Sequence, residues 1–239
     1  MPQPYAAGVW SRCLNARDLG GFPTRYGVPT AAGALFRTDS PELLDSPGHT
    51  EFVAVDAGLI LDLRSDWELK EPHPFADDPS YRRIPWIDPA AEALRDPAAE
   101  PNLVDVYRNS LSRNAANISR IFQAIADAPS DRPVIVHCRA GKDRTGLAVA
   151  LLLELVGVPR DAIAADYAIS EVNLGLQDGP DVSRTRPETI LGSLEHVDGQ
   201  LGGIRTYLTG LGLTEAQLHR LASRLLPVDA QAVASDFDC

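Results

Sequence analysis

Residues 134–146 read Val134-Ile135-Val136-His137-Cys138-Arg139-Ala140-Gly141-Lys142-Asp143-Arg144-Thr145-Gly146, and the rest of the chain is best understood as support for this stretch. Its β-branched start predicts a buried strand that ends near the cysteine. A short loop with a glycine follows, and the apolar segment 147–158 begins at once, which predicts a buried helix. The stretch therefore predicts a strand, a tight loop and a helix in direct succession.

The loop from Cys138 to Arg144 has the length and the residue types of an oxyanion site. Five residues separate these two side chains, enough for successive backbone N–H groups to face one concave nest before the helix N-terminus. The N–H groups, the helix dipole and Arg144 favour the thiolate of Cys138. Arg144 can hold two phosphoryl oxygens in its planar fork, and Thr145 can hydrogen-bond the departing sulfur. The expected phosphate-binding residues are Arg139, Ala140, Gly141, Lys142, Asp143 and Arg144.

A cysteine at the base of such a nest indicates covalent catalysis. The nucleotide-binding P-loop, Gly-x-x-x-x-Gly-Lys-Ser/Thr, carries no nucleophile, whereas a thiolate below an oxyanion nest predicts a phosphocysteine intermediate. Most unpaired cysteines are structural residues of core strands. The complete pattern His-Cys-x5-Arg-Thr-Gly disfavours that explanation, and a sulfur-transfer domain is a minor alternative.

The loop 137–146 resembles the signature of the cysteine-dependent phosphatases, and more narrowly of the bacterial protein tyrosine/lipid phosphatases whose loop contains Gly-Lys-Asp-Arg-Thr-Gly. Other stretches resemble further landmarks of that family in the same order. They are Asn15-Ala16-Arg17-Asp18-Leu19-Gly20-Gly21, Leu35-Phe36-Arg37-Thr38-Asp39, Leu61-Asp62-Leu63-Arg64-Ser65, Ala165-Asp166-Tyr167 and Leu201-Gly202-Gly203-Ile204. The resemblance covers most of the chain, and it implies that residues 15–21 lie close to the active site.

The order of the predicted elements favours an α/β fold. Strands dominate early and helices fill the C-terminal third, which predicts one central, mostly parallel sheet with helices on both faces, and the resemblance implies a cysteine-phosphatase-like arrangement. With 239 residues and no break in composition, we expect a single phosphatase domain over residues 1–239, with 228–239 as a flexible tail. The expected strands lie near 17–37 (an edge pair), at 59–63, 81–87 and 134–137; the expected helices lie at 46–57, from 65, at 102–128, 147–158, 161–169, 187–196, 201–208 and 214–226.

The net charge and the cysteine content indicate which partners and which compartment to expect. The net charge of −11 argues against nucleic acid and anionic membranes, since both require a basic surface. The cysteines Cys13, Cys138 and Cys239 have no paired spacing, which favours a reducing compartment. His49, His73, His196 and His219 are scattered without ligand spacing. We therefore expect no metal and no cofactor.

The N-terminal residues lack a signal peptide, and the apolar segment 147–158 is too short to span a bilayer. We expect a cytoplasmic protein without an integral membrane segment. The resembled family includes secreted effectors, so secretion without a classical signal stays open.

Hydrolysis of a phosphomonoester with a poor leaving group needs a proton donor. Asp88 is the first candidate, because it follows a predicted strand in a loop, as an aspartate does in the resembled family. Asp143, inside the loop, is the second. His137 is expected to orient the loop through backbone hydrogen bonds, and Asp62 to support it from a buried strand by pairing with Arg64.

Lys142 stands out, because only Lys70 and Lys142 among the 22 basic residues are lysines. Lysine carries a compact point charge. Similar loops with a lysine at this place occur in phosphatases that act on phosphoinositides, and Lys142 could bind a second anionic group of the substrate.

The leading hypothesis is a metal-independent phosphomonoester hydrolase that works through a phosphocysteine. It would be a protein tyrosine phosphatase with additional activity on phosphoinositides, so that its partners are phosphorylated proteins, lipids or small molecules. A phosphatase of a sugar, inositol or nucleoside phosphate is the alternative enzyme. A phospho-binding module is the alternative without catalysis, and the intact Cys138, Arg144 and Thr145 count against it.

Overall fold

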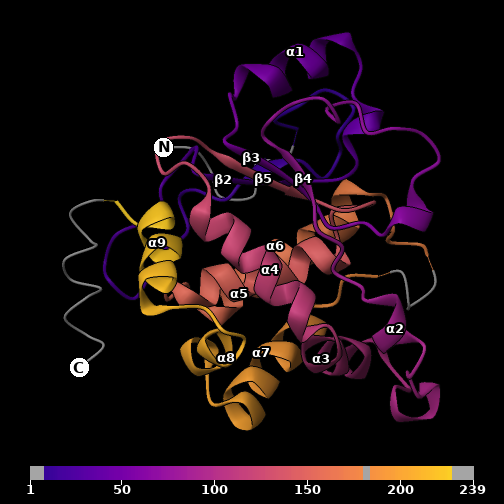
Figure 1. Ribbon diagram of the computed structural model, residues 1–239, viewed down its shortest axis with the longest axis vertical. Helices are drawn as coiled ribbons and strands as arrows, with labels where there is room; N and C mark the ends of the chain where they lie inside the picture. Colours follow the sequence, from indigo (N-terminus) through magenta and orange to yellow (C-terminus); the bar gives the residue numbers. More distant parts are fainter. Residues whose placement is uncertain (1–7, 180–183, 228–239) are drawn as a thin grey trace.

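The computed structural model describes residues 8–179 and 184–227, and these residues build a sheet with helices packed against it (Figure 1). The sheet has five strands in the order β1-β2-β5-β3-β4. They are β1 (Arg17–Asp18), β2 (Leu35–Thr38), β3 (Leu59–Asp62), β4 (Tyr81–Arg83) and β5 (Val134–His137). Only the pair β1–β2 is antiparallel. The predicted α/β class, the mostly parallel sheet and the edge strand pair are confirmed; the predicted tail 228–239 lies outside the described residues.

Strand β5 lies at the centre of the sheet, between β2 and β3. The register places Thr38 of β2 and Asp62 of β3 beside His137, the last residue of β5. The carboxyl ends of these three parallel strands therefore meet at one edge, where ligands bind in open α/β sheets. Cys138 leaves the sheet at that edge.

The two faces of the sheet are covered unequally. On one face Leu35, Leu61 and Val136 belong to the large core, together with residues of the helices α4 to α9. On the other face Phe36 and Ile135 pack in a smaller cluster with helix α1 (Ser46–Ala54). Figure 1 shows α1 on one side of the sheet and the remaining long helices on the other. Helices on both faces are thus confirmed.

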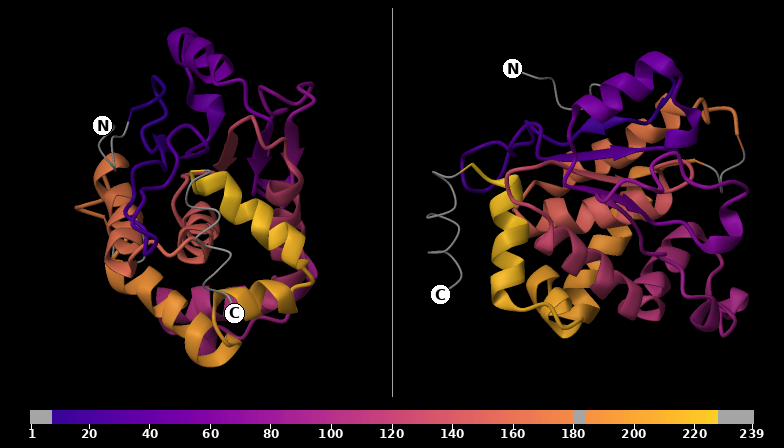
Figure 2. Two further views of the ribbon diagram at one scale, coloured as in Figure 1. Left: turned by 90° about the vertical axis from the view of Figure 1, so that its left-hand side faces the viewer. Right: turned by 45° about the horizontal axis from the view of Figure 1, so that its top comes forward.

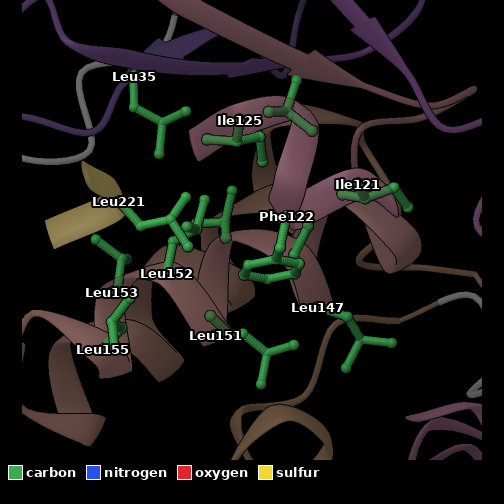
Figure 3. Packing of buried hydrophobic residues seen from close by; sticks show 14 of the residues in the cluster. Leu35, Ile121, Phe122, Ile125, Leu147, Leu151, Leu152, Leu153, Leu155 and Leu221 are labelled. Carbon is green, nitrogen blue, oxygen red and sulfur yellow. The ribbon is translucent and has the colours of Figure 1, made fainter. Parts of the chain in front are cut away.

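Helix α5 (Asp143–Leu155) is the centre of the larger side. It contacts the later helices α6, α7, α8 and α9, which surround it in the left view of Figure 2. Ten of its 13 residues are buried, and Figure 3 shows its leucines beside Phe122 of α4. The other helices of this side are α2 (Pro89–Glu92), α3 (Leu103–Arg113), α4 (Ala115–Asp127), α6 (Arg160–Asn173), α7 (Pro187–Leu201), α8 (Ile204–Gly210) and α9 (Glu215–Leu225).

Several predicted boundaries are wrong for local reasons. The helix predicted at 102–128 is two helices that meet at the buried Asn114, which follows the last residue of α3 and precedes the first residue of α4. Its side-chain Nδ2 donates to Ser110 Oγ at 3.0 Å. Helix α1 is capped by Asp45, whose carboxylate accepts the Gly48 N–H at 2.9 Å, and it ends at Ala54 instead of Ala57. The helix predicted from residue 65 is a single 3-10 turn, η2 (Asp66–Glu68).

Residues 89–100 contain α2 and the short turn η3 (Pro97–Ala99). The carboxylate of Glu100, whose side chain is buried, pairs with Arg95 and with Arg113, the latter at 2.6 Å. These ion pairs tie the segment to α3.

Candidate active site

The loop between β5 and α5 begins at Cys138, whose side chain is 2% exposed. Gly141 has φ of +63°, a conformation that favours glycine. A Cβ atom there would lie 2.2 Å from the Thr38 carbonyl oxygen. The loop therefore packs directly against the end of β2, and only glycine fits at this position.

The carbonyl groups of the loop point outward, into hydrogen bonds with its surroundings. The Arg139 carbonyl accepts the Ser40 N–H at 3.1 Å, and the Ala140 carbonyl accepts Asn15 Nδ2 at 2.9 Å. The Gly141 carbonyl accepts Arg37 Nη2 at 2.6 Å. In a trans peptide the N–H points opposite to the C=O, so the N–H groups that follow these carbonyls face inward. This is the backbone arrangement that the predicted anion nest requires.

One buried carboxylate organises the groups that hold the loop. Asp166 of α6 pairs with Arg17 at 2.6 Å and with Arg37 at 2.5 Å. Arg17 in turn donates to the side-chain oxygen of Asn15 at 2.6 Å. Burial alone would raise the pKa of the Asp166 carboxyl, but Arg17 and Arg37 outweigh burial and hold this pKa below its ordinary value.

Arg144, on the first turn of α5, is held by Glu68 of η2. Its Nη1 and Nη2 lie 2.5 Å and 2.8 Å from the two carboxylate oxygens, a bidentate pair. Glu68 also accepts the Ser65 N–H at 2.8 Å. Burial alone would raise the pKa of the Glu68 carboxyl, but Arg144 outweighs burial and lowers this pKa. The guanidinium plane of Arg144 is thus fixed before any phosphate arrives.

His137 and Asp62 are the last residues of β5 and β3, at the edge of the sheet where the loop begins. His137 Nδ1 lies 3.2 Å from the Cys138 carbonyl oxygen, and Asp62 pairs with Arg64 at 2.9 Å. The sequence did not point to His73, whose ring stacks on that of His137 with 5.1 Å between centroids. Burial lowers the pKa of His137, and burial with His137 nearby lowers the pKa of His73 to about 4. Both rings are therefore neutral at pH 7.

Asp62, His73 and His137 could hold a metal ion by residue type, since one ligand atom of each lies within 4.8 Å of the others. Their hydrogen bonds favour a supporting role. His73 Nδ1 accepts the Phe75 N–H at 3.1 Å, so the proton of the neutral ring is on Nε2 and blocks the inward nitrogen. Both oxygens of Asp62 already accept from Arg64.

Asp143 is the first residue of α5 and joins a hydrogen-bond chain. The hydroxyl of Tyr107, on α3, donates to Asp143 Oδ1, and the Tyr107 and Tyr167 hydroxyls are 2.9 Å apart. Lys142 Nζ lies 3.4 Å from the same carboxylate oxygen. The Lys142 side chain is buried and turned toward Asp143, which leaves it poorly placed for a second anionic group of a substrate.

Asp88 caps α2 near the end of the sheet that carries the loop. Its carboxylate accepts the Ala90 N–H at 2.9 Å, and its own N–H donates to Asn114 Oδ1 at 2.7 Å. Two residues earlier, the Trp86 N–H bonds to the Leu63 carbonyl, beside Arg144. Within residues 8–179 and 184–227, no hydrogen bond or ion pair joins Asp88 to the loop.

The profile of the tyrosine phosphatase family matches residues 9–227 of this chain. The chain belongs to the tyrosine phosphatase family. It is 28% identical to the triple specificity protein phosphatase PtpB of Mycobacterium tuberculosis over 92% of this chain and 97% of that protein. It is 31% identical to a tyrosine-protein phosphatase of Nostoc commune over 85% of this chain and 78% of that protein.

Membership confirms the family resemblance of the loop, and the chain is a cysteine-dependent phosphatase that acts on phosphorylated substrates. A cleft of about 720 Å³ opens beside the loop of this tyrosine phosphatase, with Arg139 and Ala140 in its wall. Across the described ranges, no helix has the length and apolar character needed to cross a bilayer.

Sequence reasoning identified the loop of this phosphatase but not most of the groups that hold it. The family landmarks quoted from the sequence contain Asn15, Arg17, Arg37 and Asp166, but no contact was predicted for these residues. A buried charge in such a landmark was the signal that could have indicated their role. No local signal connected Glu68 with Arg144, because the two residues are far apart in the sequence and the pairing depends on the fold.

The buried ion pairs of Asp166 predict a large effect on stability. Asp166→Asn leaves Arg17 and Arg37 buried without their counter-charge, and the free energy of unfolding at pH 7 should fall by about 3–5 kcal/mol. Asp198→Asn is the matched control: it breaks a surface pair with Arg160 of the same 2.6 Å separation, worth at most about 1 kcal/mol. Urea unfolding measures both, and equal losses would contradict the role given to Asp166.

The Asp166 carboxylate also predicts that the free energy of unfolding depends on pH. Because the folded-state pKa of Asp166 is depressed, its contribution to stability is fully present above the unfolded-state pKa of about 4. The contribution is lost as the pH falls through the folded-state value. The difference in unfolding free energy between wild type and Asp166→Asn should therefore shrink in urea titrations below about pH 4. A difference that stays constant with pH would show that the loss is one of packing.

The hydrogen-bond chain at Asp143 predicts unequal effects of two tyrosine hydroxyls. Tyr107→Phe removes a donor to a carboxylate and should lower the unfolding free energy by about 1.5–3 kcal/mol, whereas Tyr167→Phe removes a bond between neutral groups and should cost about 0.5–1.5 kcal/mol. Urea unfolding at pH 7 compares them, with p-nitrophenyl phosphate turnover as the check on the loop. A larger effect of Tyr167→Phe would mean that Tyr107 does not hold Asp143.

Proposed function

We propose that this phosphatase hydrolyses phosphotyrosine in proteins without a metal ion, through a phosphocysteine at Cys138. The observation that carries the proposal is the outward orientation of three successive loop carbonyls, which turns the N–H groups that follow them toward the inside of the loop that begins at Cys138. Arg144, fixed by Glu68, supplies a preorganised fork for two phosphoryl oxygens. Protein groups alone can thus receive the charge of a phosphoryl group in transfer.

The proposed reaction has two steps. The Cys138 thiolate attacks phosphorus, the P–O bond to the tyrosine breaks, and the departing oxygen takes a proton from a carboxylic acid. Water then attacks the phosphocysteine, giving a proton back to the same carboxylate, and inorganic phosphate and the thiolate are released. The buried hydroxyl of Thr145 is proposed to hydrogen-bond the sulfur as it leaves.

Asp88 is the proposed general acid. It lies two residues beyond Trp86, whose N–H bonds to the Leu63 carbonyl beside Arg144. Asp143 is less suited to this role. Its carboxylate accepts a hydrogen bond from Tyr107 and pairs with Lys142, so groups of the protein already hold it in place at the start of α5.

A second candidate activity is the hydrolysis of phosphoinositides. The Mycobacterium relative bears the name triple specificity protein phosphatase, and the cleft beside the loop is large enough for a substrate that extends beyond one phosphoryl group. A phosphatase of small metabolite phosphates would use the same nest and the same intermediate. A panel of phosphopeptides, phosphoinositides and metabolite phosphates separates the three.

A cytoplasmic location is also part of the proposal. Cys13 and Cys138 are both free thiols, and thiols persist in a reducing compartment. A nucleophilic cysteine of this kind would lose its activity on oxidation.

The nucleophile is tested by Cys138→Ser. The hydroxyl is not ionised in the nest, so turnover of p-nitrophenyl phosphate should fall by at least about 1,000-fold while phosphate still binds. Cys13→Ser, at the other buried cysteine, is the control and should retain turnover. Rapid acid quench of the wild type, followed by mass spectrometry, should trap phosphate on Cys138. Near wild-type turnover by Cys138→Ser in the presence of a chelator would refute the mechanism.

The general acid is tested by leaving-group dependence. Asp88→Asn should slow the hydrolysis of a phosphotyrosine peptide by about 100-fold or more, and that of an aryl phosphate with a very acidic leaving group far less. Asp96→Asn is the matched control, because Asp96 caps η3 through the same 2.9 Å bond to an N–H two residues on. Equal losses on both substrates would move the role to Asp143, and Asp143→Asn would then show the dependence.

A further inference from the structure

The cleft beside the loop is large enough to receive more than a phosphoryl group. Its volume is about 720 Å³, and Arg139 and Ala140 of the loop form part of its wall. The leucines Leu43, Leu69 and Leu174 supply apolar surface. A substrate whose phosphate lies in the nest would therefore extend along a wall that is partly apolar.

Most charged groups of this cleft are already paired. Asp39 accepts the N–H groups of Leu14 and Asn15 at 3.1 Å and 3.2 Å. Glu42 pairs with Arg64 at 2.8 Å, and Glu68 holds Arg144. The protein itself compensates the charges of these groups, so they can attract a charged ligand only weakly.

Two cations of the cleft differ from the rest. Arg139 and Lys70 both line it and are both exposed. Across the ranges 8–179 and 184–227, neither side chain has a hydrogen-bond or ion-pair partner, whereas the buried Lys142 is paired with Asp143. The free positive charge beside the loop thus comes from Arg139 and Lys70, and Glu71 is the exposed acid next to them.

We propose that Arg139 and Lys70 form a second anion subsite, which binds a carboxylate of the substrate protein near the phosphotyrosine. This inference rests on the proposed phosphotyrosine hydrolysis. A peptide suits the lining better than an inositol polyphosphate, because the leucines can contact peptide side chains. The exposed Glu71 would repel a dense cluster of phosphates. The net charge of −11 gives no diffuse attraction for an acidic substrate, so local cations have to supply it.

The subsite is tested with two phosphotyrosine peptides that differ only in a Glu or a Gln near the phosphotyrosine. Wild type should show a kcat/KM about 2- to 5-fold higher for the Glu peptide, the range of an exposed ion pair. Lys70→Gln should remove most of this preference, and Lys70→Glu should reverse it in favour of a matching Lys peptide. Arg139→Gln should lower the same ratio. Turnover of p-nitrophenyl phosphate by the Lys70 variants should be unchanged.

Arg120→Gln is the control for general electrostatics, because Arg120 is exposed on α4 and is not part of the cleft lining. It should leave the peptide ratio unchanged. Equal kcat/KM of wild type for the two peptides, or an unchanged ratio in Lys70→Gln, would overturn the subsite. So would a larger loss of Lys70→Gln on a soluble inositol polyphosphate than on the Glu peptide. Absence of p-nitrophenyl phosphate turnover in wild type would instead refute the proposed function itself.

Discussion

The structure of the active-site loop depends on a buried carboxylate between two guanidinium groups. Asp166 comes from a helix after the loop, and Arg17 and Arg37 come from strands before it. Through Arg37 this ion pair reaches the Gly141 carbonyl, and through Arg17 and Asn15 it reaches the Ala140 carbonyl. Three distant parts of the sequence must therefore meet before the loop can turn its carbonyl groups away from the nest.

Such an arrangement is costly for stability, because buried ion pairs seldom repay the loss of hydration. Its value lies in preorganisation. When three loop carbonyls face outward, the backbone N–H groups that follow them face one point inside the loop. Without fixed hydrogen-bond partners for the carbonyls, these peptide groups would be free to rotate. The burial of Arg17, Arg37 and Asp166 thus costs stability but holds the loop carbonyls in one orientation.

The sequence was sufficient to predict features that neighbouring residues form. It was insufficient to predict contacts between residues that are far apart in the chain. The strand 134–137, the loop and the following helix are a contiguous pattern, so their residues and the parallel sheet around them could be predicted. The bidentate partner of Arg144 could not, because Glu68 lies on a single 3-10 turn that was predicted to be a longer helix. Likewise, His73 meets His137 only through the packing of a segment without regular structure.

The charged side chains of the loop are paired within the protein. Arg144 pairs with Glu68, and Lys142 pairs with Asp143, which also accepts a hydrogen bond from Tyr107. These pairs offset the charges of Arg144 and Lys142, while Arg139 of the same loop is exposed. For the proposed phosphoryl group, the loop N–H groups and the N-terminus of α5, which has no side-chain cap, would add to the attraction of the two arginines. Because peptide dipoles act only at short range and in fixed directions, the chain has to secure each carbonyl of the loop, and this requirement explains why so many charged residues are buried behind it.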